Sequence, residues 1–247
     1  MNLQKKCSIM NTKYLEMSFW EHLEELRWCL IKIIISVLLA SIIIYNSSEF
    51  WMQLLIRPSK SLSLTLQVLN VTSIFIVKLN LAIIGGLFLA YPFILYQIWK
   101  FISPAFIIKK NMILLLIITS NIFFIVGAMF AYHIIIPVSL KFFTSLITNI
   151  MVLYNFTLEG YLLYMISFIV AFGLIFQIPF LSLILTRIGL FTPPFLKQYR
   201  KVSILIFLII SAIITPPDPI SQLLVVLPLI LLYELSIIIS QVFKPKH

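Results

Sequence analysis

The sequence has few charged residues, few glycines and few cysteines. Only 11% of its 247 residues are charged, eight are acidic and six are glycine, whereas 62% are hydrophobic. An ordinary soluble domain is about one-quarter charged, so this composition excludes a mainly water-facing fold. The two cysteines, Cys7 and Cys29, form no metal-type pair and indicate nothing about redox chemistry.

Motifs for catalysis and cofactor binding are missing as well. The sequence contains no P-loop, no histidine pair at metal-ligand spacing and no G-x-S-x-G motif. We therefore predict no catalytic residue, no metal, no cofactor and no enzyme activity. The net charge of +10 comes from basic residues scattered along loops rather than from a basic domain, so nucleic acid is not an expected partner.

What the sequence does have is long apolar runs. About 20 apolar residues cross a bilayer as a helix, and six predicted spans lie near residues 30–45, 79–99, 112–136, 161–185, 202–215 and 223–240. The fifth run stops at Pro216 and Pro217 and is too short to cover about 30 Å of hydrocarbon. The expected fold is an all-α polytopic membrane protein with six transmembrane helices, the two C-terminal ones short.

Several residues within or beside these runs are unusual for a membrane span. Prolines are expected to bend helices and make the bundle concave, with or without a functional consequence; they are Pro92, Pro137, Pro179 and Pro228. Glu234 and Gln177 are intramembrane polar residues and so candidates for function. The alternative is that each side chain only forms a hydrogen bond to a neighbouring helix. This structural role is favoured for Gln177, because burying an amide costs less free energy than burying a carboxylate.

Basic residues predict the orientation, because loops facing the inner compartment are enriched in lysine and arginine. With the N-terminus inside, fourteen lie on the inner side and four on the outer side, the outer ones being Arg57, Lys60, Lys78 and Lys141. Both chain ends are therefore expected on the inner side, with residues 242–247 forming a short tail. An even number of spans is required.

The first 29 residues form an inner N-terminal tail and carry too much charge for a removable signal peptide. An amphipathic helix is predicted at residues 18–29, where Ser18 and Glu21 make a capping box. We expect it to lie along the membrane surface before turning into the first span. Its polar face consists of Glu21, His22, Glu24 and Glu25.

Short motifs in a fixed order together resemble the TatC family, over roughly residues 18–243. They are His22–Arg27, Tyr91–Trp99, Phe101–Ala105, Ala131-Tyr132 before Pro137, Ala171–Gly173 with Pro179, and Thr215–Asp218 with Ser221 and Gln222. TatC is the multi-spanning receptor subunit of the twin-arginine, or Sec-independent, protein translocase. The resemblance implies six helices in a glove-like, concave bundle.

The resemblance also implies a function. The family binds signal peptides of folded cargo at its inner surface, and with single-span amphipathic partners moves that cargo using the proton-motive force. Implied contacts of the signal peptide are Glu21, Glu24, Glu25, Arg27, Phe101 and Lys110. An outer-side loop motif is expected at Pro58, Pro216, Pro217 and Asp218. Membrane lipid and other subunits of a homo- or hetero-oligomer are further expected partners.

Two positions depart from the family pattern. Lys110 stands where members typically carry a glutamate that pairs with the cargo's two arginines, and Gln177 stands where many carry an intramembrane glutamate. A lysine at contact distance repels arginine by about 1 kcal/mol in water. We expect recognition to be relaxed and to depend on Glu21, Glu24 and Glu25.

The bias toward Ile, Leu, Phe, Lys, Asn and Tyr suggests A+T-rich codons, as in an organelle genome. It favours the mitochondrial inner membrane over the plastid thylakoid or a bacterial inner membrane, with cargo such as a Rieske-type iron-sulfur protein. Two alternatives are a hydrophobic subunit of a respiratory or proton-translocating complex and a secondary transporter. The second lacks the internal repeat expected of it.

Overall fold

The computed structural model describes residues 19–61, 64–106, 110–145, 155–187, 192–214 and 219–242. The elements, in chain order, are α2 (Phe19–Asn46), α3 (Ser48–Ser61), β1 (Thr65–Gln67), α4 (Ser73–Phe106), α5 (Lys110–Phe130), the π-helix η1 (Ala131–Ile135), α6 (Ile136–Ser145), β2 (Asn155–Thr157), α7 (Leu158–Ile175), α8 (Gln177–Arg187), α9 (Pro193–Gln198), α10 (Arg200–Ile214) and α11 (Pro219–Val242). Almost every described residue is helical, as the composition predicts.

Five helical segments in the described part of the chain are long and apolar enough to cross a membrane. They are Trp20–Asn46, Ser73–Phe101, Leu114–Ser145, Leu158–Thr186 and Gln222–Val242. The predicted fifth span corresponds to α10, which has 15 residues and is therefore roughly 22 Å long. The last predicted span is longer than expected, because α11 has 24 residues and begins at Pro219, a residue well suited to the first turn of a helix.

The predicted turn between a surface helix and the first span is wrong. α2 runs without interruption for 28 residues from Phe19 to Asn46, so the acidic segment is the first part of the span helix itself. No glycine or proline lies between Glu21 and Leu30 to interrupt the helical hydrogen-bond ladder. The predicted capping residue, Ser18, lies outside the described residues.

Two of the four prolines coincide with irregular helix geometry. The predicted fourth span is divided into α7 and α8 at Phe176, close to Pro179, which cannot donate a backbone hydrogen bond. Before Pro137 the chain forms η1, in which the Ile136 N–H donates to the carbonyl of Ala131. Pro92 and Pro228 lie within the continuous helices α4 and α11.

Small residues allow the helices to pack closely. The most extensive contact between helices joins α2 and α4, and a Cβ atom at Gly86 would lie only 2.2 Å from Ser41 Oγ. α7 lies at the centre of the core, where Met165, Phe168 and Phe172 are fully buried. Such close backbone approach, rather than hydrophobic burial alone, is what joins helices in lipid.

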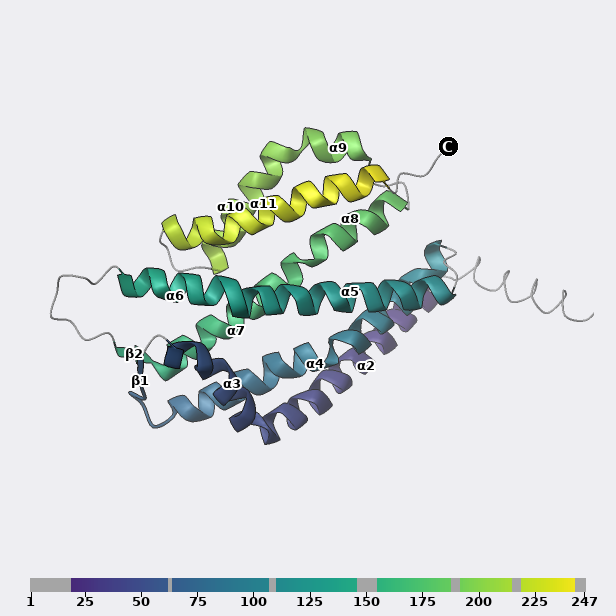
Figure 1. Ribbon diagram of the computed structural model, residues 1–247. Helices are drawn as coiled ribbons and strands as arrows, with labels where there is room; N and C mark the ends of the chain where they lie inside the picture. Colours follow the sequence, from purple (N-terminus) through teal and green to yellow (C-terminus); the bar gives the residue numbers. More distant parts are fainter. Residues whose placement is uncertain are drawn as a thin grey trace, which may run out of the picture.

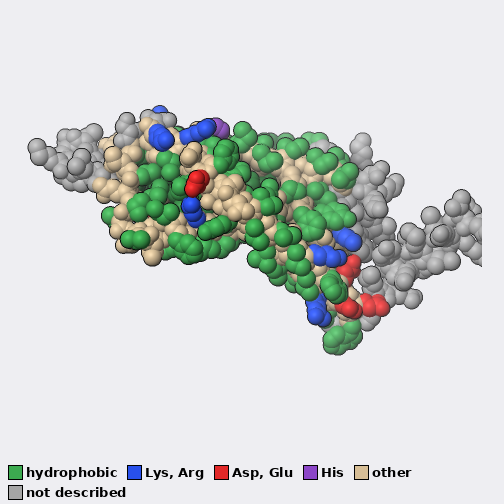
Figure 2. Space-filling view, turned by 90° about the horizontal axis from the view of Figure 1, so that it is seen from below, with side chains coloured by type: hydrophobic (Ala, Val, Ile, Leu, Met, Phe, Trp, Pro, Cys, Tyr) green, Lys and Arg blue, Asp and Glu red, His purple; other side chains and the backbone are tan. Residues whose placement is uncertain are grey.

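The two ends of the bundle differ (Figure 1). α2 begins and α11 ends at one end, as an even number of crossings requires. We call this the inner end, after the prediction from charge. At the opposite, outer end lie α3 and a parallel pair of three-residue strands, β1 and β2, with Leu66 opposite Phe156. These strands depart from the all-α fold that the sequence predicts. Figure 2 shows a hydrophobic surface between charged side chains that gather toward the two ends.

Candidate functional site

The predicted signal-peptide contacts on α2 lie in its first three turns, at the inner end. Glu21, Glu24 and Arg27 are exposed, whereas Glu25 is half-buried. Glu21 is in the first turn of α2, where a negative charge is stabilised by the positive end of the helix dipole. Because the helix is continuous, these side chains are fixed relative to the membrane span.

The C-terminal part of α4 supplies the next predicted residue, Phe101. Its ring stacks on the imidazole of His22, with ring centroids 4.4 Å apart and planes at 13°. This contact joins the start of α2 to the end of α4. The structure therefore places Phe101 against the acidic segment through His22, a residue that the sequence assigns only to the polar face of the helix.

Glu25 follows His22 by one helical turn and occupies an unusual environment. Its Oε2 atom is buried and accepts no hydrogen bond within the described part of the chain. A buried, unpaired carboxylate oxygen is costly. One turn further on, the Cys29 thiol lies within electrostatic range of Glu25 and of the ammonium groups of Lys32 and Lys100. The inner acidic surface is hereafter Glu21, His22, Glu24, Glu25 and Phe101.

Lys110 is the first residue of α5, at the inner end of the bundle (Figure 1). The structure describes the backbone of Lys110 but not its side chain. Its contact with the cargo signal peptide therefore stays a prediction. The outer-loop residues Pro216, Pro217 and Asp218 also lie outside the described residues.

Gln177 joins two helices. The Ser120 hydroxyl donates to Gln177 Oε1 at 2.6 Å, and Gln177 Nε2 donates to the Ser120 carbonyl at 3.1 Å. Both residues are buried. The amide thus links α8 to α5, which is the role that the alternative interpretation gave it.

Glu234 has a partner that sequence reasoning missed. Its Oε2 atom accepts a 2.7 Å hydrogen bond from Arg200 Nη2 across the α10–α11 hairpin, and both side chains are more than 40% exposed. Arg200 opens α10, so the pair lies toward the inner end. Glu234 is therefore neither solitary nor fully buried, and it gives no support to a proton relay.

Pro58 lies inside α3 rather than in a loop. The carbonyl four residues earlier, at Leu54, accepts a 2.8 Å hydrogen bond from the Tyr132 hydroxyl. A proline cannot supply the usual in-helix donor for that carbonyl. Tyr132 therefore replaces it and attaches α3 to the bundle.

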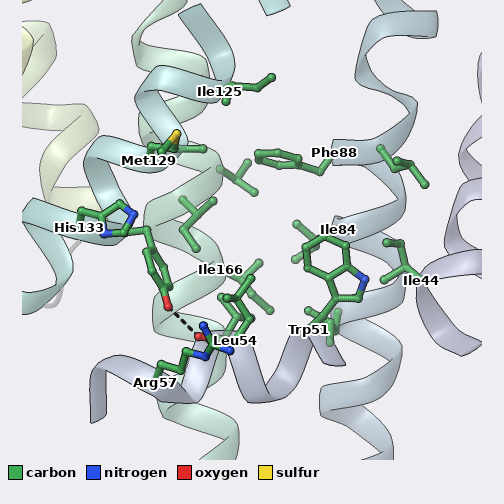
Figure 3. A pocket seen from close by; sticks show the side chains of 18 residues that line it. Ile44, Trp51, Leu54, Arg57, Ile84, Phe88, Ile125, Met129, His133 and Ile166 are labelled. Atoms are coloured by element: carbon green, nitrogen blue, oxygen red, sulfur yellow. Dashed lines mark hydrogen bonds between the residues drawn. The ribbon is translucent and has the colours of Figure 1, made fainter. Parts of the chain in front are cut away.

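Sequence reasoning also missed a cavity of about 620 Å³ near α3. Helices α2, α3, α4, α5 and α7 and the π-helix η1 contribute its mostly apolar lining. Figure 3 shows Trp51 and Arg57 on α3 at one end of this cavity and His133 on η1 at its side. From the sequence, Arg57 contributes only to the prediction of topology, because no local pattern indicates which distant helices surround it.

Comparison with known proteins agrees with the resemblance in the motifs. The family model for the Sec-independent protein translocase protein (TatC) matches residues 21–228. The chain is 37% identical over 233 residues to the protein of that name from Carboxydothermus hydrogenoformans, an alignment that covers 94% of this chain and 96% of the relative. It is 34% identical over 231 residues to TatCy of Bacillus subtilis, covering 92% and 89% respectively.

A solved structure gives the same answer for the fold. The crystal structure of a twin-arginine translocase receptor, TatC, superposes with a TM-score of 0.83 at 34% identity, covering 90% of this chain and 99% of that one. The family model spans well over half of the sequence, and the relatives align along most of their length. The chain belongs to the TatC family of Sec-independent protein translocase proteins.

Proposed function

We propose that this chain is the core receptor subunit of a Sec-independent protein translocase, and that the inner acidic surface binds the basic part of a cargo signal peptide. Its relatives are named as translocase proteins, and the solved structure is named as a twin-arginine translocase receptor. The residues implied by the resemblance, Glu25 and Phe101, lie on helix segments joined by the His22–Phe101 stack.

The observation that carries the proposal is the buried Oε2 atom of Glu25, which has no hydrogen-bond partner among the described residues. Binding a cation is the simplest way to satisfy such an oxygen, because a charge-assisted hydrogen bond is stronger than a neutral one. An arginine offers donors in a planar fork that matches a carboxylate. The exposed carboxylates of Glu21 and Glu24 on the same helix would attract further basic residues of the signal peptide.

We further propose that recognition of an arginine pair is relaxed in this protein. Lys110 adds positive charge at the inner end, and it opposes an arriving arginine wherever the two approach. Affinity should then depend on the carboxylates of Glu21, Glu24 and Glu25 more than on one arginine-specific contact.

Binding of signal peptides to the full chain in mild detergent tests both ideas. Peptides with Arg-Arg, Lys-Lys and Gln-Gln pairs are compared on the wild type, on Glu25→Gln and on Glu49→Gln, a control at the exposed outer carboxylate beside Lys78. Glu25→Gln should weaken Arg-Arg binding about tenfold, and Glu49→Gln should leave it unchanged. If Glu25→Gln binds the Arg-Arg peptide as tightly as the wild type does, Glu25 is not part of the binding site. If the Glu25→Ala variant still binds only the Arg-Arg peptide, recognition of the arginine pair is not relaxed.

The proposed partners are single-span amphipathic Tat-type subunits, assembled with this chain into a homo- or hetero-oligomer and driven by the proton-motive force. Affinity purification in mild detergent should recover such subunits and signal-peptide-bearing cargo. Recovery of respiratory subunits instead would favour the first alternative function. Substrate-dependent ion flux by the reconstituted chain alone would favour a secondary transporter.

The chain is a membrane protein, and its reported relatives are bacterial. These relatives support no particular organelle, so the mitochondrial inner membrane and a Rieske-type cargo stay predictions from composition. Localisation of a tagged chain in the source cell would test the prediction of the mitochondrial inner membrane.

A further inference from the structure

The cavity near α3 opens sideways into the region of the membrane hydrocarbon. Leu89 on α4 and Ile125 and Met129 on α5 line it, and these side chains are 50%, 50% and 55% exposed. All three belong to helical segments that can span the membrane. Their exposed surfaces therefore face lipid, and the gap that they border joins the cavity to the bilayer interior.

The outer end of the same cavity carries the cationic side chain of Arg57, and His133 lies on the adjoining side wall. Arg57 comes from α3 and His133 from η1, and both side chains are exposed as well as lining the cavity. Figure 3 shows Arg57 beside the hydrogen bond to Leu54, with His133 on the adjoining wall. A π-helix holds an extra residue per turn and often occurs at functional sites, and here it supplies the histidine.

A cavity that is apolar, open to lipid and cationic at its outer end has the chemistry of a phospholipid-binding site. A volume of about 620 Å³ is within the range of small-molecule pockets. A lipid tail gains little by leaving hydrocarbon for an apolar cavity, so selectivity has to come from the headgroup. Arginine binds phosphate bidentately, whereas it repels the basic part of a signal peptide.

We propose that this cavity binds an anionic phospholipid of the outer leaflet, with one acyl chain between α4 and α5 and the phosphate at Arg57 and His133. The lipid would fill the space between α3 and the span helices and stabilise the outer end. This site is separate from the inner acidic surface and does not depend on the proposed receptor function.

Electron spin resonance of chain-labelled lipids tests the proposal. The full protein is reconstituted in phosphatidylcholine vesicles that contain labelled phosphatidylglycerol or labelled phosphatidylcholine, and the motionally restricted fraction is measured. The wild type should prefer phosphatidylglycerol by roughly fivefold, the effect expected of one basic residue near an anionic headgroup. Arg57→Gln should remove most of that preference.

Lys60→Gln is the matched control, because Lys60 is an exposed basic residue on the same helix that does not line the cavity. Its variant should keep the wild-type preference. Ile125→Trp, at the exposed mouth, should lower the restricted fraction of both lipids by obstructing the cavity.

Equal restriction of the two lipids by the wild type, an unchanged preference in Arg57→Gln, or an equal loss in Lys60→Gln overturns the proposal. A photo-crosslinker at Met129 distinguishes the occupants directly. Adducts to phospholipid support the lipid site, whereas adducts to a bound signal peptide in place of lipid assign the cavity to cargo.

Discussion

The hydroxyl of Tyr132 donates a 2.8 Å hydrogen bond to the carbonyl of Leu54, 78 residues earlier in the chain. Leu54 needs this donor because Pro58, four residues later in α3, has no backbone N–H. The next carbonyl, that of Leu55, accepts a bond from the Tyr161 hydroxyl at 3.1 Å. Two tyrosines from the bundle thus hold the outer helix at consecutive backbone positions.

Replacing Tyr132 by Phe should lower the free energy of unfolding by about 1–2 kcal/mol, because the Leu54 carbonyl loses its donor. Thermal unfolding in detergent would measure the loss. Adding Pro58→Ala restores an in-helix N–H for that carbonyl, so the cost of Tyr132→Phe should fall to about half or less in that background. An identical cost in both backgrounds would show that Pro58 is not the reason for the contact.

Adjacent glycines on α4 should differ in their tolerance of alanine. A Cβ atom at Gly86 would lie 2.7 Å from the backbone of Ser41, whereas one at Gly85 would meet only the side chain of Ile44, at 2.9 Å. Backbone cannot move aside as a side chain can, so Gly86→Ala should cost about 1–3 kcal/mol and Gly85→Ala clearly less. The two unfolding temperatures, compared under the same detergent conditions, test this. Equal losses would contradict the α2–α4 packing.

The ion pair of Arg200 and Glu234 should give a measurable but small coupling. Because both side chains are over 40% exposed, we expect a double-mutant coupling energy of about 0.5–1 kcal/mol for Arg200→Gln and Glu234→Gln. The charge-swapped chain, Arg200→Glu with Glu234→Arg, should recover most of the stability lost in either single reversal. Additive effects of the two reversals would mean that the side chains do not pair.

The stack of His22 on Phe101 should position the inner acidic surface. Phe101→Ala should weaken signal-peptide binding several-fold, since an aromatic pair contributes about 0.5–1.5 kcal/mol. His22→Phe keeps an aromatic ring at that place and should retain most of the affinity, whereas His22→Ala should not. If His22→Phe is as damaging as His22→Ala, the imidazole acts through its own hydrogen bonds or charge and not through the stack.

Much of the fold could be predicted because the bilayer imposes a simple rule on the sequence. An apolar run must become a helix of sufficient length, since lipid cannot satisfy backbone groups, and the helices lie where those runs occur. The exceptions have local causes. The acidic segment continues directly into the first span because no residue interrupts its hydrogen bonds, and η1 precedes Pro137.

The candidate site was only partly predictable. The acidic motif at Glu21 to Arg27 and the aromatic Phe101 were identified from their resemblance to the family, but the partner of Phe101, His22, follows from how α2 and α4 pack. The pairing of Glu234 with Arg200 depends on the register of α10 against α11, which no periodicity specifies.

By itself, the sequence determined a membrane-spanning, almost wholly helical protein with its positive charge mainly on one side. Those properties depend on the polarity and order of residues along the chain, because each segment partitions into lipid or water and forms its backbone hydrogen bonds according to its own local sequence. Only the tertiary structure decided that Glu25 Oε2 is buried without a hydrogen-bond partner in the described part of the chain, and that Arg57 and His133 line the same cavity. It also decided that the Tyr132 hydroxyl donates to the Leu54 carbonyl, which Pro58 leaves without its usual donor. Each of these relationships joins groups on different helices or depends on what surrounds them, so side-chain packing rather than local pattern sets it.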